Sequence, residues 1–203
     1  MGVFFLLRYN ESMPTSKLNV FNRALAALHQ EPVIDVNSHT PELAKLRSAE
    51  EMTRQALLQS QRWDFATKRT ELTYISDYTF GEYTKLFALP NDYLEVWRVY
   101  DIEGQDIDYA KISDGLICDA SRVFVEYVFD ETDYSKYDAT FGEALALALA
   151  ERVSENVLYS DSKTDYIAKA AAKQQAIAAS KAVGRSPRTW SQSTTWLNGR
   201  NNY

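Results

Sequence analysis

The sequence is poor in the residues that build covalent and metal-bound sites: among 203 residues it has one cysteine and two histidines. With a single thiol, Cys118, no disulfide can form within the chain, which indicates a reducing compartment. Cys118 lies in the apolar run LIC at residues 116–118, so we expect a buried, inert thiol that packs as a small hydrophobic group. The spacings CxxC, HxxxH and HExxH are all missing, so we expect no zinc site.

Glycine is scarce as well, and its seven residues are scattered singly, so neither the dinucleotide-binding nor the Walker A glycine motif occurs. His29 and His39 both fall near one predicted loop and have no motif that would supply a catalytic partner. We expect them at the surface or at a helix end. Together these absences predict a chain without cofactor and without enzymatic activity.

Long hydrophobic runs are missing too. The apolar run at residues 3–7 (VFFLL) is too short for a signal core or a membrane span, so we expect no membrane anchor. We expect residues 1–14 to form an N-terminal extension that packs on another surface. The formal charge of −6 argues against a general nucleic-acid binder, although DNA can pass nearby without being held.

Acidic residues are plentiful, and pairs of them leave one enzymatic alternative open. Asp130 and Glu131 with Asp133, or Glu143 with Glu151, could serve as the two carboxylates of a glycosidase, as in a virion-associated peptidoglycan hydrolase. A chain with 28 acidic residues offers such pairs by chance, so we favour a solvated surface role for them.

Three segments have the spacing of amphipathic helices, with apolar residues three and four positions apart, and a fourth segment is rich in alanine. Thr15 or Ser16 can cap the first, and Thr40 before a proline can cap the second. The fourth contains eight alanines between residues 168 and 182, which favours close packing with a neighbour, and Gly184 is a natural helix stop. The predicted helices cover residues 16–29, 40–62, 138–159 and 163–183.

The middle of the chain instead has short runs rich in β-branched and aromatic residues, with turn residues between several of them. These runs predict an antiparallel β meander with strands at residues 71–74, 84–89, 94–100, 106–111, 115–119 and 123–129. The fold class is therefore α+β: a bundle of about four helices with an inserted meander and an extended C-terminal arm. The predicted segments are the extension 1–14, bundle helices 15–69, the β-rich insertion 70–132, bundle helices 133–183 and the arm 184–203.

The composition changes after Gly184, because the arm has three arginines, no acidic residue and three large aromatic residues. Disordered solubilising tails usually lack large aromatics, whereas tryptophan and arginine dominate binding energy at interfaces. We therefore expect the arm to bind a partner protein. The candidate contact residues are Arg185, Arg188, Trp190, Trp196, Leu197, Arg200 and Tyr203.

Four stretches, taken in order, resemble the head-to-tail adaptor subunits of short-tailed bacteriophages, the tail tubular protein A family. They are LNVFNRAL (18–25) followed by EPVI (31–34), QRWDFATKR (61–69), FALPNDY (87–93) leading into VWRV (96–99), and FGEAL (141–145) with ALA (148–150). The family tends to have glycine after the leucine that precedes Glu-Pro, whereas this chain has His29 and Gln30 there.

The resemblance implies a structural protein of the virion neck, assembled in the host cytoplasm. About twelve copies would form a ring beneath the portal protein, with the tail nozzle docked on the other side and double-stranded DNA passing through the lumen without specific binding. It further implies that the bundle forms the ring wall, that the arm reaches the portal, and that the β region faces the nozzle or neighbouring subunits. A host helical scaffold protein is the remaining alternative.

Overall fold

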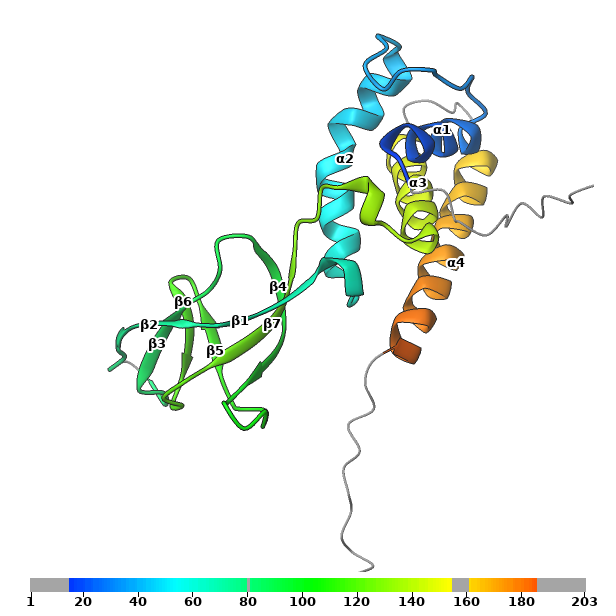
Figure 1. The fold of residues 1–203 in the computed structure, drawn as a ribbon. Helices are drawn as coiled ribbons and strands as arrows, with labels where there is room; N and C mark the ends of the chain where they lie inside the picture. Colours follow the sequence, from blue (N-terminus) through cyan, green and yellow to red (C-terminus); the bar gives the residue numbers. More distant parts are fainter. Residues whose placement is uncertain (1–14, 80, 155–160, 186–203) are drawn as a thin grey trace, which may run out of the picture.

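The computed structural model describes residues 15–79, 81–154 and 161–185, which form a helical lobe and a β lobe (Figure 1). The helices come from both ends of the described chain, and the strands lie between them in sequence. The predicted α+β class, four helices with an antiparallel β insertion, is confirmed. The four helices are α1 (Lys17–Ala27), α2 (Pro41–Gln59), α3 (Ala139–Ser154) and α4 (Asp161–Arg185).

Side-chain caps fix the starts of three helices. Ser16 Oγ accepts from the Asn19 backbone N–H at 3.1 Å, and Thr40 Oγ1 accepts from the Leu43 N–H at 3.3 Å. Asp138 Oδ1 accepts from the Phe141 N–H at 2.7 Å. These hydrogen bonds satisfy donors that a helix start leaves without an intrahelical acceptor. The caps predicted at Ser16 and Thr40 are confirmed.

One helix end differs from the expectation. The predicted stop at Gly184 is wrong, because α4 continues through Gly184 to Arg185. Glycine in a helix costs only about 1 kcal/mol relative to alanine, and the alanine-rich turns before it favour helix. The predicted end of α3 near residue 159 lies outside the described residues.

Helix α3 is the centre of the helical lobe, because α1, α2 and α4 all pack against it (Figure 1). Its alanines and leucines are buried on nearly every side, among them Ala144, Leu145 and Leu149. Small side chains let three helices approach one central helix, which explains the alternation of alanine and leucine in its sequence. In the part of the chain that the structure describes, no helix has the length and apolarity needed to cross a membrane.

The β lobe consists of two antiparallel sheets that share one core. The first sheet has the order β1-β7-β4, and the second has the order β2-β3-β6-β5. Phe87, Leu116 and Val125 are buried between the sheets together with Cys118, so the expected buried thiol is confirmed, and burial raises its pKa. The strands are β1 (Thr67–Glu71), β2 (Thr73–Asp77), β3 (Lys85–Ala88), β4 (Tyr93–Tyr100), β5 (Ala110–Ile112), β6 (Gly115–Cys118) and β7 (Phe124–Phe129).

The strand order is not the consecutive one of a simple meander. The first and last strands, β1 and β7, pair with each other, so the chain enters and leaves the β lobe on neighbouring strands. The strand predicted at 71–74 is in fact the junction of two strands, because the chain passes from one sheet to the other at Leu72, which is buried. Strand β1 (TKRTE) was missed because it has no apolar residue, and pairing with β7 holds it extended.

Candidate interaction site

Most of the arm residues expected to contact a partner lie outside the described residues. Arg185 is the last residue of α4. Arg188, Trp190, Trp196, Leu197, Arg200 and Tyr203 are in residues 186–203, and their role in binding stays a prediction, as does that of residues 1–14.

The first acidic group considered for catalysis takes part in ion pairs and loop hydrogen bonds. Asp130 accepts two hydrogen bonds from the Arg54 guanidinium, and Glu131 accepts one from Lys136 Nζ at 2.7 Å. Asp133 Oδ1 accepts from the Ser135 N–H at 3.0 Å and so holds the turn that follows. The Arg54 guanidinium keeps the pKa of Asp130 below its ordinary value, so this carboxylate is stabilised in its charged form and is a poor general acid.

The second acidic pair is too far apart for glycosidase chemistry. Glu143 accepts from Arg23 Nε at 2.6 Å and from Arg23 Nη2 at 3.0 Å. Glu151 lies eight residues further along α3, which is about 12 Å along a helix axis. Glycosidase carboxylates are about 5–9.5 Å apart, so the geometry of one rigid helix argues against this pair.

A buried ion network joins the two lobes. Arg54 of α2 is 5% exposed and contacts Glu50, one turn earlier in the same helix, while its other guanidinium edge holds Asp130 just after β7. Tyr134 donates its hydroxyl to Glu50 Oε1 at 2.7 Å, and Lys17 of α1 lies 3.7 Å from Glu50 Oε2. Burial raises the pKa of Tyr134, which keeps its hydroxyl protonated as a donor. Helices α1 and α2 and the end of the β lobe are thus fixed to one another.

An arginine–aromatic stack covers the first sheet on the side away from the β core. Arg122 lies over the Phe124 ring, with its guanidinium carbon 5.6 Å from the ring centroid. Phe124 stacks on Tyr100 of the neighbouring strand at 5.8 Å and 19°, and Arg98 lies 4.9 Å over Tyr100. Two cations thus enclose two aromatic rings, an arrangement that is attractive at every contact.

Carboxylates hold the arginines of this stack in place. Arg122 donates to both oxygens of Glu71, at 2.7 and 2.8 Å, and Arg98 pairs with Asp106. The stack is therefore a rigid surface of arginine and aromatic side chains, and such residues dominate the binding energy of protein interfaces.

A buried carboxylate extends the surface toward the helices. Glu126 of β7 has 4% of its side chain exposed, forms an ion pair with Arg62 at 2.9 Å and accepts a hydrogen bond from Arg69 Nε at 2.7 Å. Arg69 itself is 60% exposed. Glu126 thus anchors Arg69 of β1 on the same sheet, beside the stack, and also holds Arg62 in the segment between α2 and β1.

The stack was not identified from the sequence. Its signal is the two-residue spacing of an arginine and an aromatic residue, Arg98 with Tyr100 in β4 and Arg122 with Phe124 at the start of β7. Pairing of β4 with β7 brings these residues together, and that pairing depends on a strand order that the sequence does not give.

The structure assigns structural contacts to several motif residues that carry the family resemblance. Asn22 exchanges two hydrogen bonds with the Val33 backbone, each of 2.8 Å, and so holds the loop after α1. Trp63 packs edge-on against Phe141 at 4.8 Å, where α2 meets α3. Asp92 accepts a hydrogen bond from the Tyr127 hydroxyl. Burial of Tyr127, together with this hydrogen bond, raises the pKa of the phenol to about 12. These motif residues stabilise the fold and do not themselves identify a partner.

A groove of about 420 Å³ also lies among α2, α3 and α4. Small residues such as Ala56 and Ala148 line it, together with Glu151 and Arg152. Arg152 Nη1 makes a long hydrogen bond of 3.4 Å to Thr53 Oγ1. The groove is open and polar at its rim, and nothing in its geometry identifies an occupant.

The remaining expectations concern metals and histidines. Within residues 15–79, 81–154 and 161–185, no group of three or more potential ligands could hold a metal ion. His29 and His39 are exposed, and His29 terminates α1, so their expected positions are confirmed.

No protein-family model matches the sequence. No curated protein matches it either.

Proposed function

We propose that this chain is the head-to-tail adaptor subunit of a short-tailed bacteriophage, a structural protein of the virion neck. About twelve copies form a ring that joins the portal to the tail nozzle, and the genome leaves through the lumen. The protein has no catalytic role and needs no cofactor. The sequence motifs suggest the family, and the rigid connection of the two lobes and the charge distribution support it.

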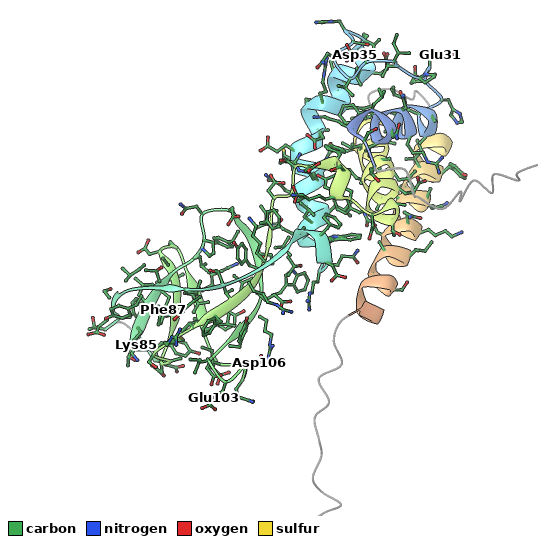
Figure 2. All side chains as sticks on the ribbon, in the orientation of Figure 1. Glu31, Asp35, Lys85, Phe87, Glu103 and Asp106 are labelled. Atoms are coloured by element: carbon green, nitrogen blue, oxygen red, sulfur yellow. The ribbon has the colours of Figure 1, made fainter. Side chains whose placement is uncertain are left out.

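One structural observation carries most weight: the two lobes are fixed into a single elongated unit whose two far ends are both exposed. Figure 2 shows Glu31 and Asp35 at the far end of the helical lobe, and Glu103 and Asp106 at the far end of the β lobe. The Glu50–Arg54–Asp130 network holds the lobes together. A linker between two large assemblies needs this stiffness, because a flexible joint would not transmit a fixed geometry from one partner to the other.

The charge distribution also fits an adaptor. Residues 67–129, which hold the strands that the structure describes, contain twelve acidic and six basic residues, so they account for the whole formal charge of −6. Residues 184–203 contain three arginines and no acidic residue. The two parts are therefore suited to partners of opposite charge. A net negative body also favours passage of DNA without adhesion, since it offers few phosphate contacts.

The two alternatives differ from the adaptor in a measurable way. A peptidoglycan hydrolase would release soluble fragments from purified cell wall and lose activity in Glu143→Gln or Glu151→Gln variants. A host scaffold protein would have the same mass with or without a phage portal. An adaptor subunit would be found in a larger complex only when the portal is present.

Truncation after Arg185 tests the proposal and leaves α4 whole. Because the three large aromatics and two of the arginines of the arm are then missing, the truncated chain should remain folded but should not join purified portal. Circular dichroism checks the fold, and sedimentation with the portal checks the binding. A truncated chain that still joins the portal as the full chain does would exclude the arm as the portal contact.

A further inference from the structure

In the second sheet, eight residues point away from the β core, and none of them is charged. Phe87 and Leu116 point into the core, so the residues on either side of them in β3 and β6 point outward. The register places one outward residue of each strand in a row across the sheet. This row consists of Ser76, Leu86, Ile117 and Ala110. The other outward residues are Thr73 opposite Ala88 and Gly115 opposite Ile112.

The two sheets of the β lobe differ in their outer faces. An antiparallel sheet with one face in water normally alternates apolar and polar side chains. The first sheet follows this rule, because its outer face holds Arg98 and Glu126. Strands β3 (KLFA) and β6 (GLIC) instead have apolar residues on both faces, as is typical of strands covered on both sides. Ile117 is only 6% exposed, although it belongs to neither of the two hydrophobic cores that the described residues form.

No described helix covers this outer face, because the four helices lie beyond the first sheet (Figure 1). Residues 1–14, which are outside the described part of the chain, contain the apolar run VFFLL at residues 3–7. Its valine and phenylalanines favour an extended chain. The five side chains have neither a charge nor a hydrogen-bonding group, so packing on an uncharged apolar face would bury them without any loss of polar hydration.

The chain is long enough to bring this run to the second sheet. Thr15 contacts Gly142 near the start of α3, and the adjacent Phe141 packs on Trp63. From Trp63 the chain takes ten residues to reach the first residue of β2. Residues 3–7 precede Thr15 by eight to twelve residues, which span about 26–43 Å when extended. Two segments of similar length thus start from the same part of the helical lobe, and one of them ends at the second sheet.

We propose that residues 3–7 pack on the outer face of the second sheet of the same molecule, over Leu86 and Ile117. The more polar residues 8–14 connect the run to α1. The extension thereby shields an apolar face that would otherwise favour association between copies. The contact is made within a single chain, so the inference does not depend on the adaptor function.

The composition of the face argues against three other occupants. DNA needs cationic contacts for its phosphates, and the eight outward residues offer none. Residues 186–203 contain two arginines and many hydroxyl and amide groups, which would lose water on an apolar face. The same face of a second copy would bring together two β regions that each carry a net charge of −6 over residues 67–129, from twelve acidic and six basic residues.

Thiol labelling tests the contact at one residue of the face. Ser76 is exposed and lies opposite Leu86, whereas the native Cys118 is buried and gives little background. Ser76→Cys is introduced into the full chain and into a chain that begins at Met13, and the rates of reaction with a maleimide are compared. Ser121→Cys, at an exposed residue between β6 and β7, is the matched control. Circular dichroism checks the fold of each protein.

A second set of variants keeps the length of the chain and so tests the contact even where the truncated chain fails to fold. Phe4→Asp combined with Phe5→Asp places a charge on both sides of an extended run. Asn10→Asp combined with Ser12→Asp adds the same charge outside the run and serves as the control. Both pairs are combined with Ser76→Cys in the full chain.

We expect Ser76→Cys to react at least tenfold more slowly in the full chain than in the chain that begins at Met13, and Ser121→Cys to react equally in both. The Phe4/Phe5 variant should react as fast as the truncated chain, and the Asn10/Ser12 variant as slowly as the full chain. Equal rates for Ser76→Cys in the two chains would overturn the contact, and so would slow labelling that persists in the Phe4/Phe5 variant. Slow labelling seen only at high protein concentration would assign the run to a second copy and overturn the intramolecular contact.

Discussion

Arg54 and Asp130 form a bidentate pair that joins helix α2 to the end of strand β7, with Nε–Oδ1 at 2.8 Å and Nη2–Oδ2 at 2.9 Å. The two residues are 76 positions apart in sequence. Their side chains meet where the helical lobe borders the β lobe, and Glu50 occupies the remaining edge of the guanidinium. One arginine thus serves two carboxylates at this joint, where Gln55 also donates to Asp130 at 3.0 Å.

Removing that arginine should destabilise the protein strongly. In Arg54→Met the buried Glu50 loses its nearer cation and keeps only the longer contact with Lys17, and Asp130 loses its bidentate partner, so we expect a loss of about 3 kcal/mol in the free energy of unfolding, measured by urea titration. The control is Arg23→Met, which removes the exposed bidentate pair with Glu143 and should cost about 0.5 kcal/mol. Equal losses in the two variants would mean that the joint is no stronger than a surface ion pair.

The same pair predicts an acid-labile fold. Arg54 lowers the pKa of Asp130, and Lys68 lowers the pKa of Asp92, with Tyr127 adding a hydrogen bond. Because both pKa values are lower in the folded state, their contribution is complete above the ordinary aspartate pKa of about 4 and is lost as the pH falls through the folded values. Unfolding free energy should therefore fall below about pH 4.

The pH dependence can be assigned with a matched pair of variants. Urea titrations at neutral and acidic pH should show a smaller difference for Asp130→Asn than for wild type, because the variant has no proton to bind at this site. Glu51→Gln, which changes an exposed carboxylate on α2, should retain the wild-type difference. An unaltered difference in Asp130→Asn would show that other groups govern acid unfolding.

His29 predicts a stabilising substitution. His29 follows the last turn of α1 and has a left-handed φ of 56°. The His29 N–H donates to Ala26 O at 3.1 Å, and the Gln30 N–H donates to Leu25 O at 2.9 Å, as at a common type of helix end. Glycine adopts this conformation without the strain of a Cβ, so His29→Gly should stabilise the protein by about 1 kcal/mol. Thermal unfolding measures the gain, and Gln30→Gly, at a residue without a positive φ, should give none.

Gly115 is required for a different reason, the close approach of two strands. A Cβ at this position would lie 2.1 Å from the Phe87 carbonyl oxygen. We expect Gly115→Ala to cost about 3 kcal/mol through overpacking and backbone strain. Gly104→Ala is the control, because Gly104 also has a positive φ but has no atom within 4 Å of the added Cβ, and it should cost about 1 kcal/mol.

The helical lobe was largely predictable because its signals are local. The cap at Thr40, the apolar spacing of α1 and the alanine content of α4 are all features of a few adjacent residues. The strand order was not predictable, because pairing of Thr67 with Val128 joins residues about sixty positions apart. The arginine–aromatic stack depends on that order, so the sequence does not predict that Tyr100 and Phe124 lie side by side.

The most direct test of the adaptor function is the mass of the purified full-length chain with and without purified portal, measured by native mass spectrometry and imaged by electron microscopy. The account predicts a 23.2 kDa monomer alone and, with portal, one complex enlarged by about twelve copies arranged as a ring at one end. A chain that stays monomeric in the presence of portal, or one that forms the same assembly without it, would contradict the account.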